Sequence, residues 1–139
     1  MTGTAFQTQL PKILIKFRED KIEFAADIEA MFSRVRLTPE DARFHRFLWK
    51  EAGNDDVGVI QMNRLSFGDK CSLFVAISVV HRVAEDYGKD HPEATNAIRE
   101  NYYLDSTETT DGAVRLAQDV RNILAAGDFH LRNWTSKFN

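Results

Sequence analysis

Two long amphipathic segments, each followed by a glycine, constrain the fold of this chain more than any other sequence feature. In the segment 69–88, apolar side chains recur every three or four positions, which predicts a helix with one buried face. Asp69 is placed to cap its start and Gly88 to end it. A second such segment begins at residue 109 or 110 and stops at Gly127. Both helices need a partner layer that covers their apolar faces.

Short β-rich stretches around these helices predict strands. KIEFAAD (21–27) alternates in polarity and predicts a strand that ends at Asp27. RFHRFLW (43–49) and VGVIQMNRLSF (57–67), with the turn residues EAGNDD between them, predict an antiparallel pair. NYYLD (101–105) and DFHLRNW (128–134) predict two further strands. The pattern favours an α+β fold, a small antiparallel sheet with helices packed mainly on one face.

Three weaker signals predict additional helices. Residues 10–17 place apolar side chains on one face, and Pro11 suits a first helical turn. Thr38 before Pro39 is typical of a helix start, and His91-Pro92 opens another short helix. The 139 residues fit a single domain over 1–139, long enough to bury its own core.

Composition excludes several classes of protein and site. The only cysteine is Cys71, so no intrachain disulfide can form, which favours a reducing compartment, cytoplasmic or nuclear. None of the four histidines lies at zinc-ligand spacing from Cys71 or from another histidine. No apolar run reaches the roughly 18 residues that a membrane span needs, and we expect no membrane association. The net charge of −3 argues against a free-standing basic nucleic-acid module.

Asp27 and Asp105 are the candidates for chemistry, because each is predicted to end a strand. If the two strands are neighbours, both carboxylates lie at one edge of the sheet. Magnesium prefers oxygen ligands of this kind, and paired metals support phosphoryl transfer. The alternative is that both aspartates are ordinary turn residues.

A basic stretch offers a second candidate site. Residues 34–50 carry Arg34, Arg36, Arg43, Arg46 and Lys50 against only two acidic residues. Such a cluster suits contacts with phosphates or a nucleoside triphosphate, while the alternative is a solvated face. The aromatic residues Trp49, Tyr102, Tyr103 and Trp134 suit stacking on bases or, alternatively, packing within the fold.

Four motifs, in order along the chain, resemble reverse transcriptases of Pao-type (BEL/Pao) LTR retrotransposons. ADIEAMFSRVRLTPEDARFHRFLW (26–49) resembles their first catalytic motif. SFGDKCSLFVAISVVHRVAED (66–86) resembles the glycine turn that enters their long helix. YYLD (102–105) resembles the start of their tyrosine-x-aspartate-aspartate (YxDD) turn, and AGDFHLRNWTS (126–136) the segment that closes the palm. The match runs from about Leu10 to Ser136 and implies a polymerase palm fold.

The resemblance implies a role for each matching residue. Asp27 and Asp105 match the metal-binding aspartates, with the Ile28 carbonyl as a further oxygen ligand, so Mg²⁺ or Mn²⁺ is the implied cofactor. Phe32 matches the aromatic gate that senses the sugar 2′ position; its alternative is a core phenylalanine. Gly68 matches the glycine that lets backbone approach the incoming nucleotide. The implied partners are an RNA/DNA template-primer and a dNTP, with Arg34 and Arg36 near the phosphates.

The YxDD turn departs from the family pattern. Asp105 is followed at once by Ser106, where the family has a second aspartate. Loss of four residues from Tyr-Leu-Asp-Asp-Tyr-Leu-Asp-Ser would leave the Tyr-Leu-Asp-Ser seen here, and Asp105 could then come from either copy. Leu73 also stands where the family usually has proline. We expect catalysis to be impaired, because preorganised metal ligands supply much of the rate of phosphoryl transfer.

Three functions follow as hypotheses. The first is a reverse-transcriptase-like domain of a retrotransposon polyprotein, an RNA-directed DNA polymerase by descent, without fingers, thumb, RNase H or integrase in these residues. The second is an active enzyme in which Glu108 or Asp111 replaces the missing ligand. The third is a non-catalytic module on a palm fold that binds nucleic acid or a protein.

Overall fold

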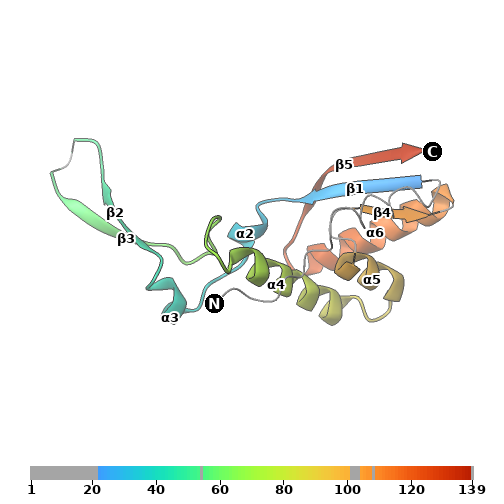
Figure 1. The fold of residues 1–139 in the computed structure, drawn as a ribbon, viewed down its shortest axis with the longest axis horizontal. Helices are drawn as coiled ribbons and strands as arrows, with labels where there is room; N and C mark the ends of the chain where they lie inside the picture. The colour runs from blue at the N-terminus through green and yellow to red at the C-terminus, as the bar shows by residue number, and fades with distance from the viewer. Residues whose placement is uncertain (1–21, 54, 101–103, 108, 139) are drawn as a thin grey trace.

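The structure, a computed structural model, describes residues 22–53, 55–100, 104–107 and 109–138 and has an α+β fold (Figure 1). The helix expected over 10–17 lies outside these residues. The described elements, in chain order, are β1 (Ile22–Ile28), α2 (Met31–Arg34), α3 (Pro39–Ala42), β2 (Arg46–Lys50), β3 (Val57–Gln61), α4 (Ser72–Tyr87), α5 (Pro92–Glu100), β4 (Leu104–Thr107), α6 (Thr110–Ala126) and β5 (Leu131–Phe138).

The main sheet has three antiparallel strands in the order β4-β1-β5. The first predicted strand is therefore central, and the strands around Asp105 and after Gly127 flank it. β1 pairs with β4 from Ile22 opposite Thr107 to Ala25 opposite Leu104. On the other side, the β1–β5 register shifts between Ala25 and Asp27, where two steps on β1 match three on β5. The antiparallel sheet expected from the sequence is confirmed for these strands.

Helices α4, α5 and α6 lie together on one side of this sheet, with α6 against the strands (Figure 1). Phe24 and Ile28 of β1 pack against the apolar cluster beneath the sheet, as the alternation of β1 predicts. The cluster takes most of its buried side chains from the faces of the three helices: Ala76, Val80, Val83, Ala84, Ala94, Ala97, Ile98, Leu116, Ile123 and Leu124. The apolar faces of the two long predicted helices, α4 and α6, are thus buried in this cluster.

The hairpin β2–β3 forms a second, separate sheet. Its antiparallel pairing is confirmed, with Phe47 opposite Ile60 and Trp49 opposite Gly58. The single sheet expected from the sequence is wrong, because this hairpin projects away from the helices as an arm (Figure 1). The base of the arm is a pair of backbone hydrogen bonds, from Leu65 N to Val35 O at 3.0 Å and from Leu37 N to Asn63 O at 3.0 Å.

The helix ends test the predicted caps. The Thr38 hydroxyl accepts a hydrogen bond from Asp41 N at 3.2 Å, which confirms it as the cap of α3. Gly88 and Gly127 follow the last residues of α4 and α6, as predicted. Asp69 is not the side-chain cap of α4, because the helix begins three residues later, at Ser72. The Asp69 carboxylate lies 3.4 Å from His45 Nδ1 instead.

In the part of the chain that the structure describes, no helix combines the length and apolar character required to cross a membrane.

Candidate functional site

The end of β1 presents the first candidate residue. Asp27 is exposed, next to last in the strand, and opposite Arg132 of β5. The extra residue on β5 bulges at this level, and Asn133 there has a φ of 54°. Its amide Nδ2 donates to Asp27 Oδ2 at 3.3 Å. Bulges commonly redirect a side chain beside a site, and this one directs an amide to the predicted metal-binding carboxylate.

An open pocket of about 710 Å³ lies at this end of β1. It brings together three predicted site residues, Asp27, Ile28 and Phe32. Helix α2 follows β1 after the short turn 29–30, so that Phe32 and Asp27 line the same pocket. The remaining wall residues are Ala26, Glu29, Ala30, Met31, Ser33, Phe67, Arg132 and Asn133.

Phe32 is half-buried: it packs against the apolar core cluster, in partial agreement with the alternative of a core phenylalanine, and also against a second aromatic side chain. Its ring meets Phe67 edge to face, with centroids 5.4 Å apart at 76°. Phe67 is 86% exposed and immediately precedes Gly68. Gly68 has a φ of 105°, which L-residues rarely adopt, and no heavy atom lies within 4 Å of where its Cβ would be. The backbone conformation requires this glycine, and the space beside it is open.

Asp105 lies on the strand next to Asp27, but at another level. The sequence predicts that Asp105 ends its strand; this is wrong, because β4 continues to Thr107. The register sets Asp105 opposite Phe24, three residues before Asp27. Three residues of a strand span about 10 Å. The two aspartates therefore lie on neighbouring strands but are not opposite each other in the sheet.

The donor set for a metal is incomplete in the described residues, which hold no group of three histidine, cysteine or carboxylate residues close enough to share one ion. Asp111, the candidate substitute ligand, lies in the first turn of α6. That turn follows Thr107, which pairs with Ile22 at the opposite end of β1 from Asp27. Glu108, the other candidate, lies outside the described residues.

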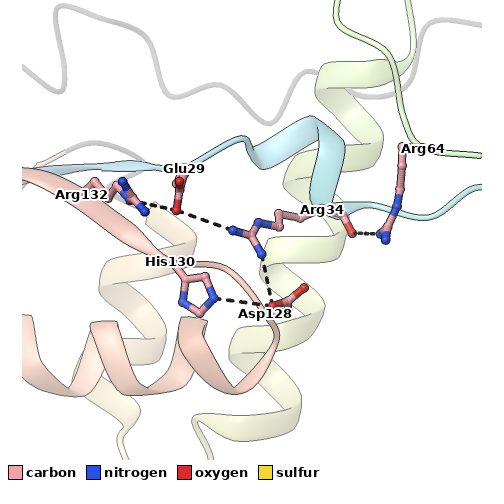
Figure 2. Close-up of polar contacts among 6 residues, drawn as sticks. All are labelled: Glu29, Arg34, Arg64, Asp128, His130 and Arg132. Atoms are coloured by element: carbon pink, nitrogen blue, oxygen red, sulfur yellow. Dashed lines mark hydrogen bonds and ion pairs between the residues drawn. The ribbon is translucent and has the colours of Figure 1, made fainter. Parts of the chain in front are cut away.

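Arg34 belongs to a chain of ion pairs that includes two residues of the pocket wall, Glu29 and Arg132 (Figure 2). Glu29 accepts from Arg132 at 2.8 Å and lies 3.5 Å from Arg34, which reaches Asp128 at 3.3 Å. His130 lies 3.5 Å from the same Asp128 carboxylate. The Arg34 side chain is only 27% exposed. Its guanidinium thus ties the β1–α2 turn to the α6–β5 loop, rather than standing open to a phosphate.

The rest of the basic stretch is spread along the surface. Arg36 is exposed, and its backbone forms an isolated antiparallel β-bridge with that of Arg64. The Arg64 guanidinium donates to Arg34 O at 3.1 Å (Figure 2). Arg43 stacks on Phe44, and Arg46 donates to Gln61 at 2.8 Å. Lys50, at the far end of β2, pairs with Asp55 at 3.4 Å. These side chains follow the arm and do not converge on the pocket.

The aromatic residues considered for base stacking lie in different parts of the fold. Trp49 is 56% exposed on the arm, so packing in a core is wrong for it. Trp134 of β5 packs at 6.2 Å on Phe24 of the central strand. Tyr102 and Tyr103 lie outside the described residues.

Sequence reasoning did not single out Glu29, Phe67, Asp128 or Arg132. Glu29 directly follows the Asp-Ile pair, and Phe67 directly precedes Gly68, so proximity to predicted residues was an available signal. Both Asp128 and Arg132 follow α6 in the sequence. Arg132 lines the pocket because β5 pairs with β1, and Asp128 contacts Arg34. Their roles depend on contacts between distant segments.

A comparison with known protein families finds none that matches this chain, and a comparison with curated proteins finds no significant match.

Proposed function

We propose that this chain is a reverse-transcriptase-like palm domain, of the Pao type, in which nucleotidyl transfer is strongly impaired. The observation that carries the proposal is the pocket at the end of β1, which joins Asp27, Ile28 and Phe32. The three residues carry the metal-ligand and sugar-gate roles that the resemblance implies. The antiparallel three-stranded sheet backed by α6, with α4 packed against α6, also agrees with a palm.

The β1–β4 register supports a loss of four residues from the YxDD turn. Pairs in this ladder have residue numbers that add up to 129, as in Phe24 with Asp105. In a longer β4 with the same register, the residue opposite Asp27 would lie three places before the residue opposite Phe24. If Asp-Tyr-Leu-Asp were inserted after Asp105 and Ser106 and Thr107 kept their partners, the first inserted aspartate would take that place. Asp105 itself would then lie opposite Ile28.

Because Ser106 keeps its partner Glu23 in both cases, the residue before Ser106 faces Phe24 whichever copy was lost, and Asp105 remains compatible with either copy. In the chain as it stands, Asp105 lies opposite Phe24, the place that the fourth inserted residue would take in the restored chain. Mg²⁺ or Mn²⁺ would be held by Asp27, the Ile28 carbonyl and the aspartates of an intact turn. Among the described residues, the pocket holds the carboxylates of Asp27 and Glu29, and Glu29 is paired with Arg132 and Arg34. No third ligand joins them, so the described residues do not fit a two-metal site and we derive no catalytic step through one.

The test restores the four residues. Mn²⁺ binding, followed by electron paramagnetic resonance, should become at least tenfold tighter when Asp-Tyr-Leu-Asp is inserted after Asp105. A matched insertion of Asn-Tyr-Leu-Asp has the same length and register but lacks the carboxylate opposite Asp27, and it should not tighten binding. Equal gains from both insertions would contradict the proposed register.

Activity is tested in a longer polypeptide that supplies fingers and thumb around this domain. Primer extension on an RNA template with Mg²⁺ or Mn²⁺ should be absent for the natural sequence and present after the insertion. Robust extension by the natural sequence would contradict the proposed impairment, and Asp27→Asn is the negative control.

A non-catalytic binding module is the second candidate, and the exposure of the whole β2–β3 arm favours it. For nucleic acid, the exposed Arg36 is the residue to test, because Arg34 is held by Glu29 and Asp128. RNA binding that weakens with salt and falls severalfold in Arg36→Ala would support this candidate. No binding at low salt would remove it.

A further inference from the structure

The β2–β3 arm exposes every residue of both its strands. A two-stranded hairpin alone is marginally stable in water and normally needs a third strand or a packing layer. Apolar side chains nevertheless lie on both faces of this one: Phe47, Trp49 and Ile60 on one face, and Leu48, Val57 and Val59 on the other. Their exposed fractions run from 41% to 72%. A hairpin with two apolar faces and no covering layer among the described residues is suited to association.

The arm also has two strand edges, and the hydrogen-bond pattern of the hairpin shows which backbone groups point outward from each edge. Met62 N donates to His45 O at 2.9 Å, so this pair belongs to the hydrogen-bonded set of the ladder. Antiparallel ladders alternate, so the pairs Phe47–Ile60 and Trp49–Gly58 belong to the same set. The backbone groups of Val57, Val59 and Gln61 therefore point away from β2, along the outer edge of β3. This edge has no strand partner in the described sheet.

The two edges differ in charge, because β2 (RFLWK) carries two basic residues and β3 (VGVIQ) carries none. If two copies joined through β2 about Leu48, Arg46 of one copy would face Lys50 of the other. Like charges directly opposite each other are destabilising, and basic residues are a common protection of edge strands. β3 is also rich in β-branched residues. The β3 edge is thus the unprotected one.

We propose that the β3 edge pairs with the β3 edge of a second copy of this chain, antiparallel about a two-fold axis at Val59. In that register Val59 faces its own symmetry mate, and Val57 faces Gln61. These residues have the outward backbone groups, so each facing pair can exchange both hydrogen bonds. The result is a four-stranded antiparallel sheet made of two arms.

The side chains fit the same register. Gly58 of one copy faces Ile60 of the other, so the large side chain lies beside the position that has none. In its own hairpin Gly58 faces Trp49, and the nearest atom to its missing Cβ is a backbone oxygen at 3.7 Å, which leaves room above the strand. The pairing is isologous, so it closes at two copies and leaves only the charged β2 edges outside.

The dimer should be weak. Pairing two five-residue strands buries less than the about 800 Å² per partner of a standard stable interface. We therefore expect sedimentation equilibrium to report a monomer at low micromolar concentration and a mass that doubles, and goes no further, at several hundred micromolar.

Proline substitutions at the two edges provide the test. Val59→Pro removes an outward N–H from the β3 edge, and Leu48→Pro removes the equivalent N–H from the β2 edge. Neither removes a hydrogen bond within the hairpin, so they are matched. Val59→Pro should weaken dimerisation at least tenfold, and Leu48→Pro should leave it within about twofold. The pair Val59→Lys and Leu48→Lys, both compatible with strand structure, should repeat this contrast if the prolines unfold the arm.

The register is tested by crosslinking after Cys71→Ser, which removes the only cysteine. Val59→Cys should then form an intermolecular disulfide on mild oxidation, and Leu48→Cys should not. A chain that stays monomeric at all concentrations would overturn the proposal and leave the edge to another partner. Growth beyond a dimer, or equal loss of dimer from both edge substitutions, would also overturn it.

Discussion

Asp105 lies opposite Phe24 in the β1–β4 ladder, not opposite Asp27. The position of a residue along a strand decides which chemistry it can share, because each residue shifts the level by about 3.3 Å. An aspartate on the neighbouring strand is therefore insufficient for a metal site; it must also lie at the level of Asp27.

The first prediction concerns this level. In the variant with Asp-Tyr-Leu-Asp inserted after Asp105, the fourth inserted residue takes the place opposite Phe24. Changing that fourth residue to asparagine should leave Mn²⁺ affinity within about twofold, because it lies roughly 10 Å along the strand from Asp27. Paramagnetic resonance titration gives the affinity. A tenfold loss would show that the shifted pairing assumed for the insertion is incorrect.

Ala30 provides a prediction about strain beside the pocket. It is exposed and has a φ of 50°, so an L-residue there carries a left-handed conformation that costs about 1–2 kcal/mol. Ala30→Gly should raise the free energy of unfolding by about 0.5–1 kcal/mol, part of the gain being offset by the flexibility of glycine. Urea denaturation measures the change. Ala125→Gly, in the regular helix α6, is the control and should be destabilising.

Gly127 provides a prediction about the contact between α4 and α6. A Cβ at this position would meet both Val83 γ-carbons at 2.5 Å, while its φ of −92° is ordinary. Gly127→Ala should therefore destabilise the fold by about 1–3 kcal/mol through overpacking alone. Adding Val83→Ala removes the clash, so the double variant should lose less stability than the two single variants added together. Additive losses in thermal unfolding would contradict this steric cause.

The ion pairs of Arg34 provide a fourth prediction. Arg34 bridges Glu29, in the turn after β1, and Asp128, in the loop between α6 and β5. A double-mutant cycle with Arg34→Met and Glu29→Gln should give a coupling free energy of about 0.5–1 kcal/mol, because both side chains are partly exposed. Arg82→Met paired with Asp86→Asn on the outer face of α4 is the control and should couple more weakly. Equal coupling in both cycles would mean that burial contributes nothing here.

His81 provides a prediction about pH. Burial lowers its pKa, and nearby Arg99 lowers it further, although Glu85 acts in the opposite direction. The unfolded chain then binds the proton more readily than the native chain, so unfolding becomes easier as the pH falls. The contribution of His81 should be complete above about pH 6.5 and decline below it, down to the lowered native pKa. Urea denaturation between pH 5 and 8 measures the slope.

His81→Gln should flatten this dependence, since glutamine does not titrate. If the His81 variant retains the full slope, another group is responsible for it.

The sequence by itself determined most of the described elements and a few of their ends. The repeat of apolar residues identified α4 and α6, and alternation identified β1, because these periods follow from helix and strand geometry alone. Thr38, Gly88 and Gly127 marked helix boundaries through hydrogen bonds to residues at most four positions away. Local chemistry is sufficient for such features.

Only the tertiary structure decided how distant elements align. Nothing local to YYLD indicates that Asp105 faces Phe24, or that β4 continues to Thr107. Nothing local to the basic stretch indicates that Arg34 is paired with Asp128 across the chain, or that the β2–β3 arm stands apart from the main sheet. Register and strand order arise from the simultaneous packing of β1 against α6 and between its two neighbours. That balance of contacts is a property of the whole fold and of no single segment.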